Sequence, residues 1–189
     1  MLHWTGSAWT PVPVPAKLND YVQSVVAIGA SSASDFWLFG TYRTTEALRW
    51  TGRTWTKVPM PEVPTAVSVA GAGIWALGAG YVMHWTGRSW ATVRLPVLPL
   101  PSGDYAAYGD LTAADAKDAW ADGIDINPGG FWLVYHQAGG HWTSGQILPG
   151  VDAHSPTPLT RIPGTGSLWA TGAAFGAKGF YGLILKYGP

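Results

Sequence analysis

Short apolar runs recur along the chain, and each one places a tryptophan three positions before a glycine. The runs are FWLFG, IWALG, AWADG and LWATG, which begin at residues 36, 74, 119 and 168. Gly, Ser, Thr, Asp and Pro are frequent around them, and no stretch sustains the 3.6-residue period of an amphipathic helix. The pattern predicts short β-strands that end in turns.

A second tryptophan-rich phrase alternates with the first. It reads HWTGSAW at 3–9, RWTGRTW at 49–55 and HWTGRSW at 84–90. Thr-Gly fits the centre of a two-residue hairpin turn, because Gly tolerates the positive φ that such turns need. With that turn, Trp4 faces Ser7 and Leu2 faces Trp9. Paired residues share a face of the hairpin, so Trp4 and Trp9 are expected diagonally opposed on one apolar face.

The order of the phrases predicts the architecture. A weaker apolar run precedes each Trp-x-x-Gly run, proline-rich stretches follow the second phrase, and successive Trp-x-x-Gly runs are 38, 45 and 49 residues apart. Four short strands in a unit of this length are typical of a β-propeller blade. We therefore expect a single all-β domain over 1–189, a β-propeller of about four blades, each a four-stranded antiparallel sheet. The expected units are 1–15 (third and fourth strands only), 16–61, 62–101, 102–149 and 150–189 (first three strands).

These units contain one strand more than four blades need, so the closure of the ring has two solutions. In the simplest closure, the N-terminal strand around Trp9 completes the last blade. Such a closure would remove exposed sheet edges. The alternative is an open arc of a larger ring, as a fragment or as half of a homodimeric ring.

Eleven of the twelve tryptophans fall on repeat positions. We expect them to pack between blades, where each large aromatic side chain buries about 150–250 Å². These structural tryptophans are Trp4, Trp9, Trp37, Trp50, Trp55, Trp75, Trp85, Trp90, Trp120, Trp142 and Trp169. Trp132 is the exception: it follows a long loop, where an indole suits sugar stacking, or it fills space left by Gln137.

A basic residue precedes the position of the aromatic residue in every third strand, and this position holds Gln137 in the third unit. The five are His3, Arg49, His84, His136 and Lys186. They would line a channel, or each would tie its strand to a backbone carbonyl or to an acid of the next blade. We favour the structural role, because functional sites usually break repeat symmetry. Asp35 and Asp118, which precede two of the Trp-x-x-Gly strands, are interpreted as turn caps.

Composition restricts the function more than the fold. Of 189 residues, 47% are hydrophobic and 12% charged, which is the opposite of a disordered chain. The formal net charge is zero and basic residues do not cluster, so no nucleic-acid partner is expected. No apolar run has the length of a membrane helix, and the first residues lack signal-peptide features. The absence of cysteine excludes disulfides and cysteine nucleophiles but selects no compartment.

Candidate ligand-binding residues lie in the loops that differ between units, since variable loops on a rigid scaffold usually carry binding. These loops share one rim of a propeller. The candidates are Tyr42, Arg43, Asp122, Asp125, Asn127, Trp132 and His154. No metal or cofactor is expected. Calcium needs more oxygen ligands than this acidic loop offers, and His136 with His141 lacks a third zinc ligand.

With both phrases described, the chain resembles the Trp-rich, kelch-like and WD40-like propeller repeats of bacterial proteins, which are often secreted. The resemblance rests on His3–Pro11 and Ser32–Gly40 with their later copies, and it covers nearly the whole chain. It implies a propeller scaffold that serves as a binding surface, and an extracellular location. The third unit departs from the pattern, with Gln137 at the tryptophan position and AGG in place of TGR.

The function expected from the sequence is a non-catalytic binding scaffold whose ligand is a glycan or a protein surface, including a second copy of the chain. No catalytic residue is assigned, because the chain has neither G-x-S-x-G nor H-E-x-x-H. One alternative is a hydrolase or lyase that acts on polysaccharide through rim carboxylates, such as Asp152 with His154. A second alternative is a structural part of a larger propeller.

Overall fold

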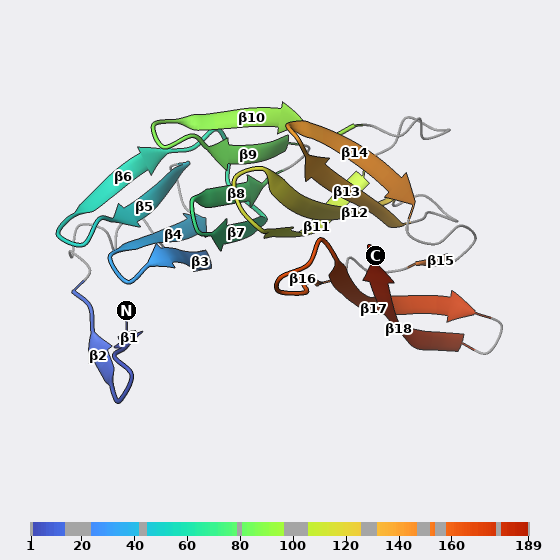
Figure 1. The fold of residues 1–189 in the computed structure, drawn as a ribbon, viewed down its shortest axis with the longest axis horizontal. Coiled ribbons are helices and arrows are strands. Elements are labelled where there is room, and N and C mark those ends of the chain that lie inside the picture. Colours follow the sequence, from blue (N-terminus) through green and yellow to red (C-terminus); the bar gives the residue numbers. More distant parts are fainter. Residues whose placement is uncertain are drawn as a thin grey trace.

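The computed structural model describes residues 2–13, 24–41, 45–78, 81–96, 106–125, 132–146, 152–153, 158–176 and 179–188. Within these residues every regular element is a β-strand, and none forms a helix able to cross a membrane. The strands form four antiparallel four-stranded sheets and one separate hairpin. The predicted all-β class with four-stranded antiparallel blades is confirmed, and the sheets follow one another along an arc (Figure 1).

Three of the sheets contain four strands that are neighbours both in sequence and in space. The first blade consists of β3 (Ser24–Ser32), β4 (Asp35–Thr41), β5 (Glu46–Trp50) and β6 (Trp55–Pro59). The second blade consists of β7 (Ala66–Ala70), β8 (Gly73–Leu77), β9 (Tyr81–Trp85) and β10 (Trp90–Arg94). The third blade consists of β11 (Ala106–Ala113), β12 (Asp118–Asp125), β13 (Trp132–Ala138) and β14 (His141–Gln146).

The fourth blade differs from the other three in the arrangement of its strands. β15 (Asp152–Ala153) and β16 (Leu159–Arg161) both pair with one side of β17 (Leu168–Gly176). β18 (Gly179–Tyr187) pairs with the other side of β17. The first strand of this blade is thus divided into two short pieces, and the blade has three strand positions across its width.

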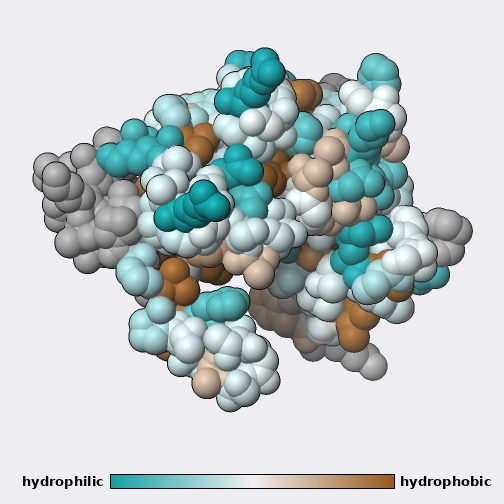
Figure 2. Space-filling view, turned by 60° about the vertical axis from the view of Figure 1, so that its left-hand side comes forward, coloured by the Kyte–Doolittle hydropathy of each residue, from teal (hydrophilic) through white to brown (hydrophobic). Residues whose placement is uncertain are grey.

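The N-terminal hairpin does not join the fourth blade. β1 (Leu2–Trp4) pairs with β2 (Trp9–Pro11) in a two-stranded sheet of its own. This hairpin stands apart from the blades in Figure 1 and forms the lower lobe in Figure 2. The closure in which the strand around Trp9 completes the last blade is therefore not formed, and the arc of blades remains open (Figure 1).

The hairpin turns differ from the prediction by one residue. Trp4 lies directly opposite Trp9, and Thr5 N–H donates to the carbonyl oxygen of Ala8 at 2.9 Å. The central residues of the turn are therefore Gly6 and Ser7. Gly6 has a φ of +99°, and a type II′ turn requires a positive φ at its first central position. The indoles consequently pair directly rather than diagonally, and the predicted common face is unchanged. The same register joins Trp50 to Trp55 and Trp85 to Trp90.

The hydrophobic core lies between successive blades. We call the face that bears the second-strand tryptophan the rear face of a blade, and the opposite one its front face. Trp37 and Phe39 on the rear face of the first blade pack against Ile74, Ala76 and Met83 on the front face of the second. Equivalent rear-to-front clusters join the second blade to the third and the third to the fourth. The core is thus a series of similar layers, as expected for a repeat fold.

Candidate functional site

In the first and third blades, the acid at the start of the second strand pairs with the basic residue of the third strand. Arg49 Nε and Nη2 donate to Asp35 Oδ1 and Oδ2 at 2.8 and 3.1 Å. His136 Nε2 lies 3.0 Å from Asp118 Oδ1. Both pairs form within one blade. The basic residues were expected to pair with an acid of the next blade, and both acids were interpreted as turn caps. The structure instead shows each acid in contact with the basic residue of its own sheet.

Each of these basic side chains also lies over the tryptophan of the second strand. The cause is the register, because β5 places Arg49 directly opposite Trp37, and β13 places His136 opposite Trp120. The Arg49 guanidinium carbon is 5.1 Å from the centroid of the Trp37 ring. The His136 and Trp120 rings are stacked with centroids 3.5 Å apart and planes inclined by 6°. The repeated acid, base and tryptophan thus hold the second and third strands together.

The second blade breaks this repeat. Gly73 stands where the first and third blades have aspartate, and a Cβ atom there would overlap the backbone of Asp115 and Ala116 in the third blade. His84 still stacks on Trp75, with ring centroids 4.2 Å apart, but within the described residues its Nε2 is buried and has no hydrogen-bond partner. Burial lowers the pKa of the His84 imidazole, so the ring is neutral at pH 7.

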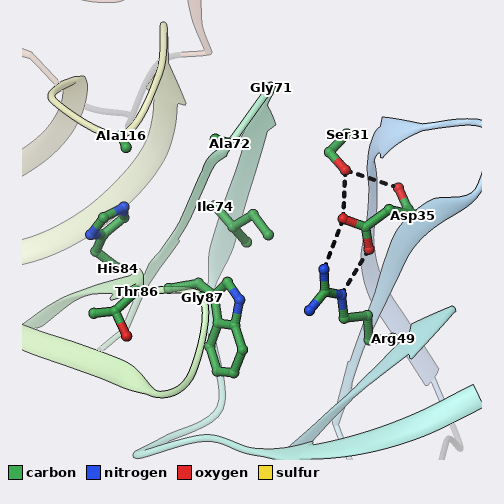
Figure 3. A pocket seen from close by; sticks show the side chains of 11 residues that line it. Ser31, Asp35, Arg49, Gly71, Ala72, Ile74, His84, Thr86, Gly87 and Ala116 are labelled. Carbon is green, nitrogen blue, oxygen red and sulfur yellow. Dashed lines mark hydrogen bonds and ion pairs between the residues drawn. The ribbon is translucent and has the colours of Figure 1, made fainter. Parts of the chain in front are cut away.

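A cavity of about 590 Å³ opens beside this histidine, between turns of the first and second blades (Figure 3). Its volume is in the range of small-molecule binding pockets, about 300–1,000 Å³. Ser31, Asp35 and Arg49 line one side, and His84 and Trp85 line the other. The cavity lies at the rim of the repeated turns, which is the rim opposite to the variable loops.

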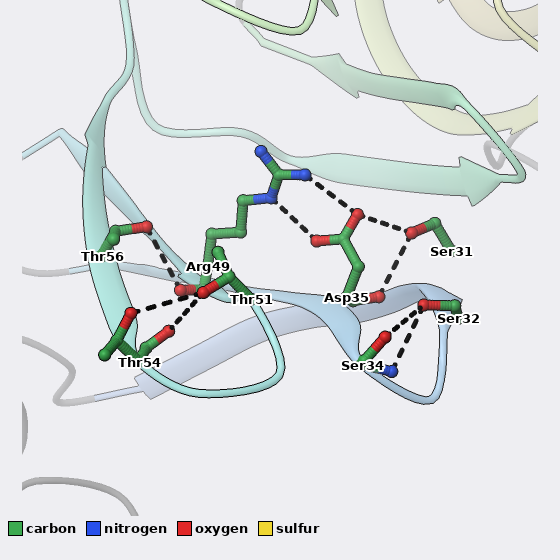
Figure 4. A network of polar contacts seen from close by, with 8 residues as sticks. All are labelled: Ser31, Ser32, Ser34, Asp35, Arg49, Thr51, Thr54 and Thr56. Carbon is green, nitrogen blue, oxygen red and sulfur yellow. Dashed lines mark hydrogen bonds and ion pairs between the residues drawn. The ribbon is translucent and has the colours of Figure 1, made fainter.

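Hydrogen bonds fix the polar side of the cavity (Figure 4). The Arg49 hydrogen bonds are the main cause that holds the pKa of the Asp35 carboxyl below its ordinary value; burial acts in the opposite direction. Ser31 Oγ, which donates to Asp35 Oδ2 at 2.7 Å, also lowers this pKa. Asp35 is therefore ionised at neutral pH and matches the charge of Arg49. Together with neutral His84, the pair leaves the cavity without net charge.

The structure describes only part of the rim that the sequence predicts as the ligand site. Four of the candidates lie outside the described residues: Tyr42, Arg43, Asn127 and His154. Asp125 ends β12 and Trp132 begins β13, and the pairing of Trp132 with Ile124 brings these backbones to the same end of the third blade. Their role in ligand binding stays a prediction.

Asp122 has a structural environment. It is 2% exposed, and its Oδ1 accepts the N–H of Asp110 at 2.5 Å. The Asp110 carboxylate accepts the N–H of Leu111 at 2.8 Å and that of Leu159, in the fourth blade, at 2.7 Å. The two carboxylates therefore connect strands of the third blade with the fourth. No group of three potential metal-ligating side chains occurs in the part of the chain that the structure describes.

Sequence reasoning did not select the cavity residues as a site. Their pattern is nevertheless present in the aligned units, where Asp35, Gly73, Asp118 and Ser167 occupy the same position. The second unit has Gly73 in place of the aspartate but keeps its basic residue, His84. This difference is the feature of the sequence that could have indicated the site. What the sequence does not give is the packing of the third blade against Gly73.

Comparison with known proteins identifies no family. No family model matches the chain, and no curated protein matches it. A solved structure of YCF48 bound to a D1 peptide is 17% identical, with a TM-score of 0.49 over 81% of this chain. YCF48 from Cyanidioschyzon merolae is 17% identical, with a TM-score of 0.48 over 94% of this chain and 75% of its own length. The N-terminal domain of Nup159 is 10% identical, with a TM-score of 0.43; the shared region covers 81% of this chain and 47% of that domain. The chain spans 50% of the length of the peptide-bound YCF48 structure.

Proposed function

We propose that the chain is a non-catalytic binding module that holds a sugar residue of a glycan in the cavity between the first and second blades. The observation that carries the proposal is the buried Nε2 of His84, which has no hydrogen-bond partner among the described residues and belongs to a residue that lines the cavity. A buried polar atom without a partner costs about 1–3 kcal/mol. A ligand hydroxyl group that reaches this nitrogen would remove that cost.

The charge of the cavity supports an uncharged ligand. Arg49 and Asp35 neutralise each other through two hydrogen bonds, and burial keeps His84 neutral. An anionic or cationic ligand would lose hydration without finding an unmatched counter-charge. A sugar hydroxyl can both donate and accept, so it can use the Ser31 hydroxyl as well as the imidazole nitrogen.

Trp85 supports the choice of a sugar among uncharged ligands. Its indole lines the cavity and is partly exposed. Pockets that combine an aromatic surface with a few convergent polar groups bind ligands that have both an apolar face and hydrogen-bonding groups. A sugar ring has this character. The predicted residues of the variable rim, Trp132 and Asp125 among them, remain candidates for a separate contact.

The test is a calorimetric titration with neutral disaccharides, namely cellobiose, maltose and chitobiose, followed by the same titrations with His84→Phe. Phenylalanine keeps the aromatic ring against Trp75 and removes Nε2. We expect at least one disaccharide to bind, at least tenfold weaker binding by His84→Phe, and unchanged or higher thermal stability of the variant. His141→Phe is the matched control, because His141 is exposed and does not line the cavity.

The outcomes separate this proposal from the alternatives. No binding of any neutral disaccharide at tens of millimolar overturns the glycan proposal. Binding that is equal in wild type and His84→Phe places the site elsewhere, and Trp132→Ala then tests the variable rim. Chromatography of the disaccharides after long incubation tests the enzyme alternative, since intact sugars support a binding module and cleaved sugars support a hydrolase or lyase.

A further inference from the structure

The rear face of the fourth blade is uncovered, unlike the rear faces of the other three. Trp169 is 43% exposed, whereas Trp37, Trp75 and Trp120 are at most 3% exposed. Ile184 and Phe180 lie on the same face as Trp169, because Trp169 pairs with Lys186 and side chains alternate along β18. They are 75% and 70% exposed. An aromatic and aliphatic patch of this kind marks an interaction surface.

The front face of the first blade is exposed at its first strand, β3, whereas Leu38 and Leu48 on β4 and β5 are buried beside Trp55. Ile28 on β3 pairs with Leu38 on that face and is 59% exposed. The equivalent residue of the second blade is Val67, which pairs with Ala76 and packs against the first blade. Ile28 therefore belongs to the kind of surface that covers a rear-face tryptophan everywhere else in the chain.

We infer that the rear face of the fourth blade of one copy packs on the front face of the first blade of a second copy. The argument is continuity, because three rear-to-front junctions already exist within the chain. The exposed rear face of the fourth blade and the exposed Ile28 position on the front face of the first blade are one of each kind. The blades with these faces lie at opposite ends of the open arc (Figure 1). Two copies that join reciprocally bury both pairs of faces, and such a two-fold arrangement closes a ring. This association does not depend on the proposed glycan site.

The first measurement is the mass of the full chain in solution, by light scattering on a sizing column over a hundredfold range of concentration. We expect a dimer of twice 20.1 kDa. Ile184→Asp places a charge on the rear face and Ile28→Asp on the front face, and both side chains are exposed, so the fold should survive. Each variant alone should be a monomer with the circular dichroism of wild type. Val93→Asp, at an exposed position on β10 outside both faces, should remain a dimer.

Mixing the two variants tests the front-to-rear geometry. In the mixture, the intact rear face of Ile28→Asp meets the intact front face of Ile184→Asp, so one junction forms and association returns. An interface between two like faces would show no such recovery. The inference is overturned if wild type is a monomer at every concentration, as it would be if one copy closed on itself. It is also overturned if both variants remain dimers, or if mixing fails to restore association.

Discussion

Trp37→Ala tests whether the tryptophans hold neighbouring blades together. The Trp37 side chain is fully buried, and its ring contacts Trp85 edge-on with centroids 5.2 Å apart and Phe39 in a stacked arrangement at 6.0 Å. An indole that buries about 150–250 Å² contributes about 4–6 kcal/mol at 25 cal/mol per Å². Measured Trp→Ala changes in cores cost about 3–5 kcal/mol. The Trp37 Nε1 is buried without a hydrogen-bond partner among the described residues, so its removal offsets about 1 kcal/mol.

We therefore expect Trp37→Ala to lower the free energy of unfolding by about 3 kcal/mol. Urea denaturation followed by far-ultraviolet circular dichroism measures this as a lower midpoint with an unchanged slope. Trp9→Ala is the matched control, because Trp9 occupies a repeat position but is 64% exposed, and it should change stability by less than about 0.5 kcal/mol. A cost below about 1 kcal/mol for Trp37→Ala, or equal costs for both variants, would refute the interblade packing.

Three further predictions concern the polar contacts and one close approach. Asp122→Ala should lower stability by about 1–3 kcal/mol in urea denaturation, because it removes a buried carboxylate and leaves the partly buried Asp110 N–H without its acceptor; a neutral effect would favour the ligand role predicted from sequence. The lowered pKa of Asp35 means that its ion pair stabilises the fold above the ordinary aspartate pKa and is lost as the pH falls below about 4. Asp35→Asn should therefore lose less stability than wild type between pH 5 and pH 2.5, and parallel losses would contradict the pairing. Gly73→Ala should lower the melting temperature because its Cβ meets the backbone of the third blade, whereas Gly166→Ala, which has open space around it, should not.

The blades follow from local patterns in the sequence. Each strand is bounded by turn residues close to it in the chain, and pairing between sequence neighbours needs no long-range information. The misplaced turn shows the limit of this reasoning. A turn centred on Thr5-Gly6 and a turn centred on Gly6-Ser7 both put glycine at a central position. The structure has the turn centred on Gly6-Ser7, in which Thr5 Oγ1 donates to the carbonyl oxygen of Ala8 at 3.0 Å.

The closure of the ring could not be read from the strand count. A count fixes how many strands are present but not the angle between successive blades, which depends on the side chains in each rear-to-front layer. Large residues such as Trp37, Trp85 and Trp90 fill the layer between the first two blades, whereas Trp120 meets the smaller Leu168 and Ala170 in the last. The open arc and the exposed Trp169 are therefore properties of packing, which the strand pattern does not contain.

The cavity beside His84 shows why the symmetry of the repeat did not predict the role of every basic residue. The basic positions are regular in all five units, and that regularity favoured a structural role for each of them. The acid positions are not regular, and the function of a basic residue depends on its partner. Arg49 and His136 have an aspartate across their own sheet, so their hydrogen bonds are satisfied within the blade. His84 has Gly73 at that position, because the backbone of the third blade occupies the space that a side chain would need. The same contact that packs the second blade against the third therefore leaves His84 Nε2 buried without a hydrogen-bond partner among the described residues.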